Sequence, residues 1–245
     1  MGRVIAVASG KGGVGKSTLA AGLGCAFAAR GHGAVLLDAD EGLRSLDLML
    51  GVTDALVFDL ADILATRCRI EQAVRPVLGV PNLSLIAAPM DLGVLSDAGE
   101  FRALCGELSA RFDEVLIDCP AGIDRVFRAT AFAADLVLLV ATADPVCMRA
   151  AAQVRALLDG ENIPCRLVLN RFDAEMIRGG GMPNLDEMVD GAEVQLIGVV
   201  PEDVQAPLHA ARGKPLFTGR AADAMGRIAR RLAGERIPLP RLTKL

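Results

Sequence analysis

The residues from Gly10 to Ser17 constrain the fold of this chain more than any other stretch, because their sequence, GKGGVGKS, contains four glycines in eight positions. An apolar run rich in β-branched residues, Arg3 to Ala8, precedes them, and such runs are typical of buried strands. The residues from Ser17 to Arg30 that follow are rich in alanine and leucine, which favours a helix. The sequence therefore predicts a glycine-rich loop that joins a buried strand to a helix.

This loop fits the P-loop pattern, in which a glycine and four further residues precede Gly-Lys-Ser or Gly-Lys-Thr. Glycines allow the backbone to approach a ligand closely, and successive N–H groups can then form a cavity for anions. The following helix adds its positive N-terminal end. We therefore expect a nucleotide in the loop, with the Lys16 ammonium on its β- and γ-phosphates and the Ser17 hydroxyl on Mg²⁺.

Composition favours an α/β fold around this loop. Of the 245 residues, 52% are hydrophobic and only 3% are aromatic, so the expected core is aliphatic. Aliphatic cores suit helices packed on parallel strands that are apolar throughout, and α/β domains of this length are often single. We expect one P-loop NTPase domain, with a largely parallel central sheet and helices on both faces.

Charge and cysteine usage argue against several other classes of protein. The formal net charge is −4, so no global basic field attracts the chain to nucleic acid, and the few aromatics argue against a base-stacking surface. We therefore expect no nucleic-acid partner. No signal peptide and no apolar run of about 20 residues are recognised, which predicts a cytoplasmic protein. The six cysteines form no C-x-x-C pair, so neither disulfides nor a cysteine metal site are expected.

Carboxylates follow two of the expected strands. Asp38 and Asp40 come after the apolar run 34–37, and Asp118 follows the apolar run 115–117. Ligands of open α/β sheets bind outside the carboxyl ends of the strands, so these acids should gather beside the loop. A hydrophobic strand that ends in an acid has the Walker B form, in which the acid supports Mg²⁺. The predicted metal site therefore comprises Ser17, Asp38 and Asp118.

The loop, with its additional lysine Lys11, resembles that of the deviant Walker A ATPases of the MinD/ParA family, which has the form Lys-Gly-Gly-x-Gly-Lys-Ser/Thr. The run DADEGLRSLDL from Asp38 is similar to the first switch of the MinD branch, and the run DCPAG from Asp118 is similar to the second. The resemblance covers residues 1–234 and leaves 235–245 as a short tail that contains proline. It implies an ATP-dependent homodimer.

The resemblance also implies roles for individual residues. In this family the early lysine, here Lys11, reaches the partner's nucleotide, and the second switch aspartate, here Asp40, positions the attacking water. Together with Lys16 these are the expected catalytic residues. A strand-end asparagine, here Asn170, contacts adenine, and a later segment resembling 201–203 contacts the base. The expected cofactor-binding residues are Gly10, Lys11, Gly12, Gly13, Val14, Gly15, Lys16, Ser17, Thr18, Gly122, Asn170, Arg171, Pro201, Glu202 and Asp203.

Three positions depart from the pattern of the MinD branch. Ser45 occupies a position where asparagine is usual, and Ala150 and Ala152 lie where acids on a partner-binding helix are common. A regulatory protein partner is therefore expected without an assigned identity. In the tail, Pro238 and Pro240 interrupt the amphipathic helix that is typical of MinD, so only weak membrane contact is expected.

Three functional hypotheses remain open at this point. The first is a spatial regulator of division-site placement, cytoplasmic and peripheral at the inner face of the plasma membrane. The second is a nucleotide-gated adaptor that positions flagellar, partition or other cargo without its own membrane cycle. The third is a binding module that holds ATP without hydrolysing it.

Hydrophobic patterning predicts the remaining elements. Further strands are expected at 83–89, 134–141, 165–170 and 195–200. Helices are expected within 54–76 and at 100–112, 145–158 and 218–231, and a glycine-rich flexible loop at 178–183.

Overall fold

The fold is known from a computed structural model that describes residues 1–173, 175, 185–216 and 218–239. Within these residues the centre is an eight-stranded sheet of order β3-β4-β2-β5-β1-β6-β7-β8. Its strands are β1 (Arg3–Ser9), β2 (Ala34–Asp38), β3 (Arg75–Pro76), β4 (Leu83–Ile86), β5 (Glu114–Ala121), β6 (Leu136–Ala141), β7 (Cys165–Phe172) and β8 (Leu196–Pro201). Neighbouring strands pair in parallel except β3 and β4, which confirms the expected α/β class.

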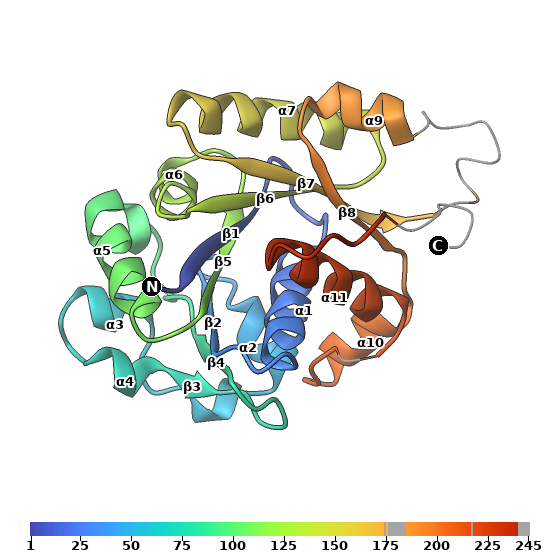
Figure 1. Ribbon diagram of the computed structural model, residues 1–245. Helices are drawn as coiled ribbons and strands as arrows, with labels where there is room; N and C mark the ends of the chain where they lie inside the picture. Colours follow the sequence, from blue (N-terminus) through green and yellow to red (C-terminus); the bar gives the residue numbers. More distant parts are fainter. Residues whose placement is uncertain (174, 176–184, 217, 240–245) are drawn as a thin grey trace.

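Helices cover both faces of the sheet (Figure 1). They are α1 (Lys16–Ala28), α2 (Ser45–Leu50), α3 (Leu60–Leu64), α4 (Ile70–Ala73), α5 (Ala98–Ser109), α6 (Arg125–Ala131), α7 (Pro145–Gly160), α9 (Leu185–Ala192), α10 (Gln205–Ala211) and α11 (Arg220–Leu232), with short 3₁₀ turns η1 (Thr53–Ala55) and η2 (Val94–Ser96). On one face α1 packs between β2 and α11, while α7 and α9 pack together on the other. Because both faces are covered, the central strands are apolar throughout rather than alternating.

The carboxyl ends of β1, β2 and β5 lie together at one end of the sheet. The register places Asp38 of β2 directly opposite Asp118 of β5. Strand β5 does not end at Asp118, as the sequence predicted, but continues to Ala121, because Ala121 pairs with Ser9 of the neighbouring β1. The glycine-rich loop follows the carboxyl end of β1, so Asp38 and Asp118 lie beside it.

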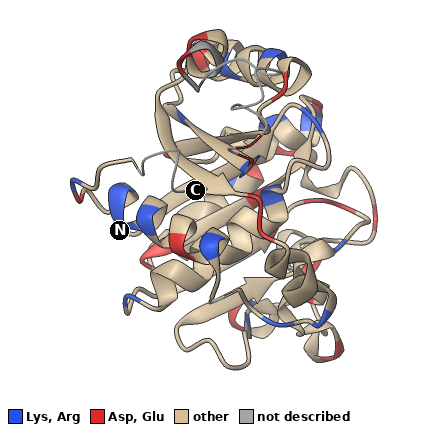
Figure 2. Cartoon of the chain, turned by 90° about the vertical axis from the view of Figure 1, so that its right-hand side faces the viewer, with Lys and Arg blue, Asp and Glu red and all other residues tan. Residues whose placement is uncertain are grey.

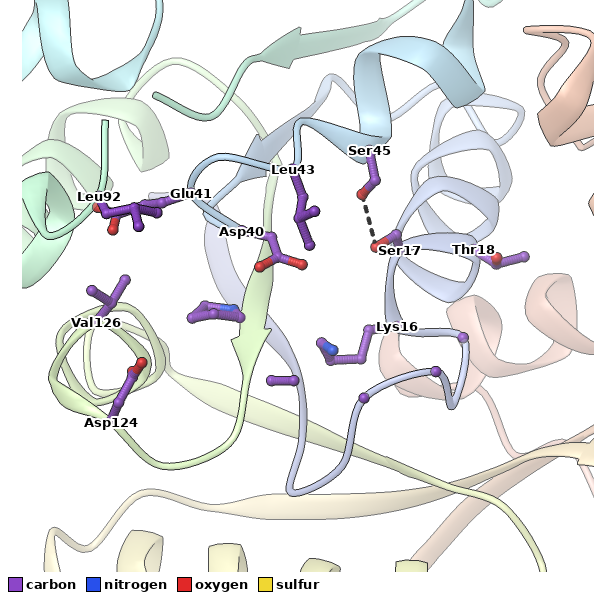
Figure 3. A pocket seen from close by; sticks show the side chains of 15 residues that line it. Lys16, Ser17, Thr18, Asp40, Glu41, Leu43, Ser45, Leu92, Asp124 and Val126 are labelled. Carbon is purple, nitrogen blue, oxygen red and sulfur yellow. Dashed lines mark hydrogen bonds between the residues drawn. The ribbon is translucent and has the colours of Figure 1, made fainter. Parts of the chain in front are cut away.

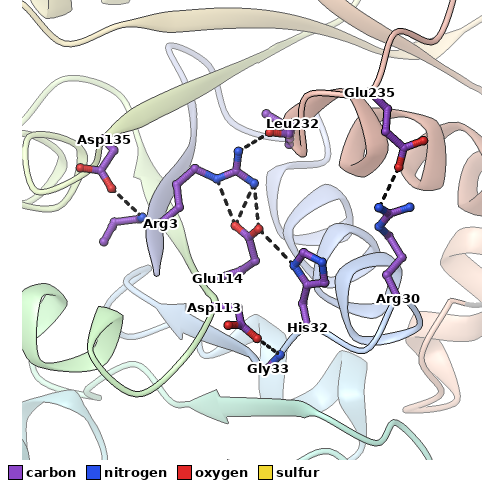
Figure 4. Close-up of polar contacts among 10 residues, drawn as sticks. Arg3, Arg30, His32, Gly33, Asp113, Glu114, Asp135, Leu232 and Glu235 are labelled. Carbon is purple, nitrogen blue, oxygen red and sulfur yellow. Dashed lines mark hydrogen bonds and ion pairs between the residues drawn. The ribbon is translucent and has the colours of Figure 1, made fainter. Parts of the chain in front are cut away.

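At the opposite end of the sheet, charged side chains join the amino ends of β1 and β5 (Figure 4). Glu114, at the start of β5, is 4% exposed, and its carboxylate accepts hydrogen bonds from the Arg3 guanidinium at 2.8 to 3.2 Å. His32 Nδ1 lies 3.5 Å from the same carboxylate. Arg3 also donates to the carbonyl of Leu232, so this cluster joins β1, β5 and the end of α11.

Several short elements were not expected from the sequence. Helices α2, α6 and α10 have only six or seven residues, and helices of that length are unstable without tertiary packing. The region 54–76 contains the expected short helices, α3 and α4, but ends in the antiparallel edge strand β3. The predicted flexible loop 178–183 and the end of the tail lie outside the described residues.

The surface and the helix lengths bear on the expected partners. Basic and acidic residues are interspersed over the side of the molecule shown in Figure 2. Among the described residues, no helix combines the length and the apolar character needed to cross a bilayer. The start of the tail lies against the body of the protein, because Glu235 pairs with Arg30 and Arg231 donates to the carbonyls of Ile237 and Pro238.

Candidate functional site

The glycine-rich loop presents free backbone N–H groups at the start of α1. Gly15, the residue before the helix, has a φ of 91° and provides no side-chain cap, so the first N–H groups of α1 remain available to an anion. Lys16 is only 7% exposed. At the other end of the loop, a Cβ on Gly10 would lie 2.6 Å from the carbonyl oxygen of Ala150, so α7 supports the loop from behind.

A cavity of about 530 Å³ opens in front of this loop (Figure 3). The side chains of Lys16, Ser17 and Asp40 lie around it, and Ser45 Oγ donates to Ser17 Oγ at 3.1 Å. Its lining residues are Gly12, Gly13, Gly15, Lys16, Ser17, Thr18, Asp40, Glu41, Leu43, Ser45, Leu92, Pro120, Ala121, Asp124 and Val126. The anion cavity expected from the sequence therefore exists, with cationic, hydroxyl and carboxylate groups around it.

A second cavity of about 270 Å³ adjoins the same loop. It is lined by Gly13, Gly15, Thr18, Asn170, Arg171, Val200, Pro201, Glu202, Asp203, Ala206, Pro207, Ala221 and Met225. The two cavities share Gly13, Gly15 and Thr18. The structure thus brings every residue of the predicted base segment together, next to the predicted phosphate cavity.

Asn170 ties the second cavity to the loop. It is 5% exposed, and its Nδ2 donates to the carbonyl of Val14 at 2.8 Å. A Cβ on Gly15 would lie 2.3 Å from the same Nδ2, so this approach requires glycine at position 15. Asn170 therefore holds the loop as well as lining the cavity.

The outer wall of the second cavity is held by charged groups. Arg171 Nε donates to Glu202 Oε2 at 2.8 Å, and this contact raises the pKa of Arg171. The Asp203 carboxylate accepts from the N–H groups of Gln205 at 2.9 Å and Ala221 at 3.0 Å. Desolvation raises the pKa of Asp203, but these backbone N–H groups and the Arg220 charge outweigh it, so its pKa is lowered.

Three carboxylates beside the first cavity have raised pKa values. Burial is the main cause at Asp118, whose pKa is raised to about 8, with the Asp38 charge adding to it and Ser17 and Lys16 opposing it. Burial also raises the pKa of Asp38 to about 6, against hydrogen bonds from the N–H groups of Leu46 and Asp40. At Asp40, burial raises the pKa and the Lys16 charge opposes the rise. Three carboxyl groups therefore lie close together, and the nearby Lys16 charge does not offset the cost of ionising them.

Asp118 is suited to a divalent cation. Its side chain is 0% exposed, and neither carboxylate oxygen has a hydrogen-bond partner of good geometry, although the Ser17 hydroxyl lies close enough to lower its pKa. Mg²⁺ prefers oxygen ligands and binds through one or two carboxylates together with water and phosphate. Among the described residues no group of three or more His, Cys, Asp or Glu is arranged to hold a metal ion.

Some predicted residues lie outside both cavities. Asp38 and Asp118 are buried behind the first cavity, and the Asp38 oxygens accept from the N–H groups of Leu46 and Asp40 at 3.0 and 3.1 Å. The exposed Lys11 lines neither cavity. The N–H of Gly122, which was expected to bind a γ-phosphate, donates to the Ser9 carbonyl at 3.2 Å here, because β5 continues alongside β1.

The sequence reasoning missed Asp124. This residue lines the first cavity, caps the start of α6 by accepting from the N–H of Phe127 at 2.8 Å, and raises the pKa of Asp40. Its position shortly after the second switch was a usable signal. Glu41 was also missed: its carboxylate accepts from the N–H groups of Gly93 and Leu95 and so fixes the loop that carries Leu92.

Known proteins resemble the chain over most of its length. The model of the CobQ/CobB/MinD/ParA nucleotide binding domain matches residues 5–216. The septum site-determining protein MinD of a Synechocystis strain is 38% identical over 244 residues, covering 97% of this chain and 92% of the relative.

Solved structures agree with this result. The MinC:MinD cell division protein complex of Aquifex aeolicus matches with a TM-score of 0.90 and 35% identity, covering 98% of each chain. MinD of Pyrococcus horikoshii in complex with Mg-ADP matches with a TM-score of 0.85 and 26% identity, covering 97% of this chain and 100% of that one.

Proposed function

Because this chain belongs to the CobQ/CobB/MinD/ParA nucleotide-binding domain family, and its MinD relatives include a cell division ATPase and a protein solved with Mg-ADP, we propose that it is a dimerising switch ATPase that regulates the placement of the division site. The observation that carries this proposal is the pair of cavities that share Gly13, Gly15 and Thr18. One has the charge and hydroxyl groups that suit a triphosphate, and the other has the amide and ion-paired wall that suit a base. MinD relatives support the assignment to cell division.

In the proposed reaction, ATP and water give ADP and phosphate. Asp40 lies at the first cavity, where its carboxylate can orient the attacking water in line with the γ-phosphate. Lys16 and the N–H groups of the loop stabilise the charge of the transition state. Ser17, Asp38 and Asp118 would hold a bound Mg²⁺, which would supply further positive charge to stabilise the transition state.

We assign Lys11 to the nucleotide of a second copy of the chain. Its side chain is exposed and lines neither cavity of its own chain, as expected for a residue that acts in trans. The loop backbone around it is fixed, because Ser9 Oγ donates to the Lys11 carbonyl at 2.7 Å. Pairing of subunits would therefore depend on nucleotide occupancy.

Phosphate release and sedimentation velocity test this function together. Wild type should hydrolyse Mg-ATP and sediment as a dimer with ATPγS but as a monomer with ADP. Asp40→Ala should lower turnover about a hundredfold while still binding ATP, and Lys11→Ala should remain monomeric. Asp186→Ala, an exposed acid on α9, is the matched control and should behave as wild type. Equal turnover in Asp40→Ala and wild type, or a wild-type monomer with ATPγS, would contradict the proposal.

A nucleotide-gated adaptor without a membrane cycle is the second candidate, and two observations favour it. Ala150 and Ala152 on α7 replace the acids expected at a partner surface, and Glu235 and Arg231 hold the start of the tail against the protein. Co-sedimentation with vesicles of anionic phospholipid separates the two functions. Pelleting with ATP but not with ADP supports a regulator that cycles on the membrane, and no pelleting with either nucleotide supports the adaptor.

A further inference from the structure

Two short helices end against each other beside the nucleotide site. Gly51, with a φ of 67°, directly follows the end of α2 at Leu50, and Gly213, with a φ of 58°, follows the end of α10. A Cβ on Gly51 would lie 2.4 Å from the Gly213 carbonyl oxygen, and a Cβ on Gly213 would lie 3.0 Å from Gly51 Cα. The two backbones therefore touch. An added Cβ at Gly51 would overlap the Gly213 backbone, and one at Gly213 would meet its neighbours at 3.0 to 3.4 Å, so glycine fits this contact best at both positions.

Helix α2 begins at the phosphate end of the site. Its first residue, Ser45, donates to Ser17 at 3.1 Å, and the N–H of its second residue, Leu46, donates to Asp38 at 3.0 Å. Both Ser17 and Ser45 line the first cavity. With six residues the helix is about 9 Å long, so a displacement of its first turn also moves its last residue.

Helix α10 belongs to the base end. Its residues Ala206 and Pro207 line the second cavity. Asp203 anchors its start by accepting from the N–H groups of Gln205, in α10, and Ala221, in α11. The position of α10 therefore sets one wall of the base cavity, and Gly213 at its other end is in contact with α2.

These contacts form a closed ring around the proposed nucleotide. The carbonyl of Val14, in the loop, accepts a hydrogen bond from Asn170 of β7. The adjacent Arg171 pairs with Glu202, which precedes α10. At the end of the same loop, Ser17 accepts a hydrogen bond from Ser45, the first residue of α2. The contact between Gly51 and Gly213 closes the ring.

We propose that the Gly51–Gly213 contact is a positioning contact that transmits occupancy of the phosphate cavity to α10, and so to the base cavity. The inference rests on the proposed nucleotide site. A polyphosphate that fixes Ser17 also fixes the first turn of α2, and the contact of backbone with backbone restrains α10 in turn. Because such coupling is reciprocal, a ligand in the base cavity changes phosphate affinity by the same factor.

Hydrogen exchange with inorganic tripolyphosphate and Mg²⁺ tests the link, because this probe has no base or ribose to touch α10. In wild type the probe should slow deuterium uptake in the loop 10–17, and through the contact it should slow uptake in residues 205–213 about fivefold, within the usual range of such coupling. Sedimentation velocity under the same conditions should show a monomer, so that subunit contacts do not contribute.

Asparagine variants isolate the contact from the backbone conformation. Asn tolerates positive φ, so Gly51→Asn and Gly213→Asn mainly add a Cβ at the point of contact. Gly79→Asn is the matched control, since Gly79 has a φ of 78° and nothing within 4 Å of an added Cβ. The response of 205–213 should be lost in Gly51→Asn, reduced in Gly213→Asn and unchanged in Gly79→Asn.

The outcomes separate the link from the site. If the loop is protected but residues 205–213 respond equally in wild type, Gly51→Asn and Gly213→Asn, or do not respond in wild type, the link is wrong and the phosphate site stands. If the loop is not protected in wild type, both are wrong. If Gly51→Asn does not fold, Gly213→Asn decides alone, because its added Cβ meets its neighbours at 3.0 to 3.4 Å, where a small shift suffices.

Discussion

Strand β5 carries two buried carboxylates four residues apart, and the protein treats them in opposite ways. Glu114, at the amino end, accepts three hydrogen bonds from the Arg3 guanidinium and lies near His32 (Figure 4). Asp118, at the carboxyl end, is fully buried without a hydrogen-bond partner of good geometry. A buried charge without a partner costs stability. Glu114 therefore contributes to the stability of the fold, whereas Asp118 has no partner within the protein and is available to the Mg²⁺ of the proposed function.

The largest expected effect is the loss of activity in Asp118→Asn. Removing the charge that holds the cation should lower phosphate release about a thousandfold, comparable to the loss of a strong electrostatic contact in other enzymes. The nucleotide-free protein should be at least as stable as wild type to urea, because a carboxyl group whose ionisation is opposed by burial is replaced by a neutral amide. Phosphate release and urea unfolding measure the two effects. A fall in both would show that Asp118 has a structural partner and would remove the contrast with Glu114.

The converse experiment is Glu114→Ala at the other end of the strand. Removing Glu114 deprives the partly exposed Arg3 of its carboxylate and should cost about 2 kcal/mol of unfolding free energy, in the range of hydrogen bonds to charged groups. Turnover of the remaining folded protein should be unchanged, since Glu114 lines neither cavity of the nucleotide site. Urea unfolding and phosphate release are the measurements. The double variant Arg3→Met, Glu114→Leu should recover part of the stability. If it does not, the other contacts of these two side chains, such as that of Arg3 with Leu232, contribute to stability as well.

The pH dependence of stability should distinguish the two ends. The pKa values of Asp118 and Asp38, about 8 and about 6, lie above the unfolded value, so the folded protein binds more protons than the unfolded chain. Their contribution to stability is therefore complete below about pH 4 and is lost as the pH rises toward 8. Thermal unfolding without nucleotide or Mg²⁺ should show this fall, and Asp118→Asn should flatten it. A wild-type stability that rises from pH 5 to pH 8 would contradict the raised pKa values.

The smallest expected effect concerns an ion pair that is not buried. Glu235 pairs with Arg30 near the Glu114 cluster (Figure 4) and also with Arg230, but its side chain is 35% exposed, against 5% for Glu114. Solvent and salt screen such pairs, so Glu235→Gln should leave the urea midpoint unchanged. A loss as large as that of Glu114→Ala would mean that pairing, and not burial, determines the stability of this end.

Much of the nucleotide site could be predicted from the sequence, because its signals are local. The loop 10–17 and the strand-end acids Asp38 and Asp118 are defined by residue type and spacing, and the ends of parallel strands meet by geometry alone. The contacts of Asn170 with Val14 and of Arg3 with Glu114 span 156 and 111 residues. Spacing along the chain contains no information about such pairs.

The amino-acid sequence by itself determined that this chain forms an α/β nucleotide-binding domain, because hydrophobic patterning and a glycine-rich loop act within a few residues. Only the tertiary structure decided which buried acid is neutralised and which is not, that Gly122 faces β1, and that Gly51 meets Gly213. The reason is physical: desolvation, register and the close approach of two backbones arise only when distant segments pack together.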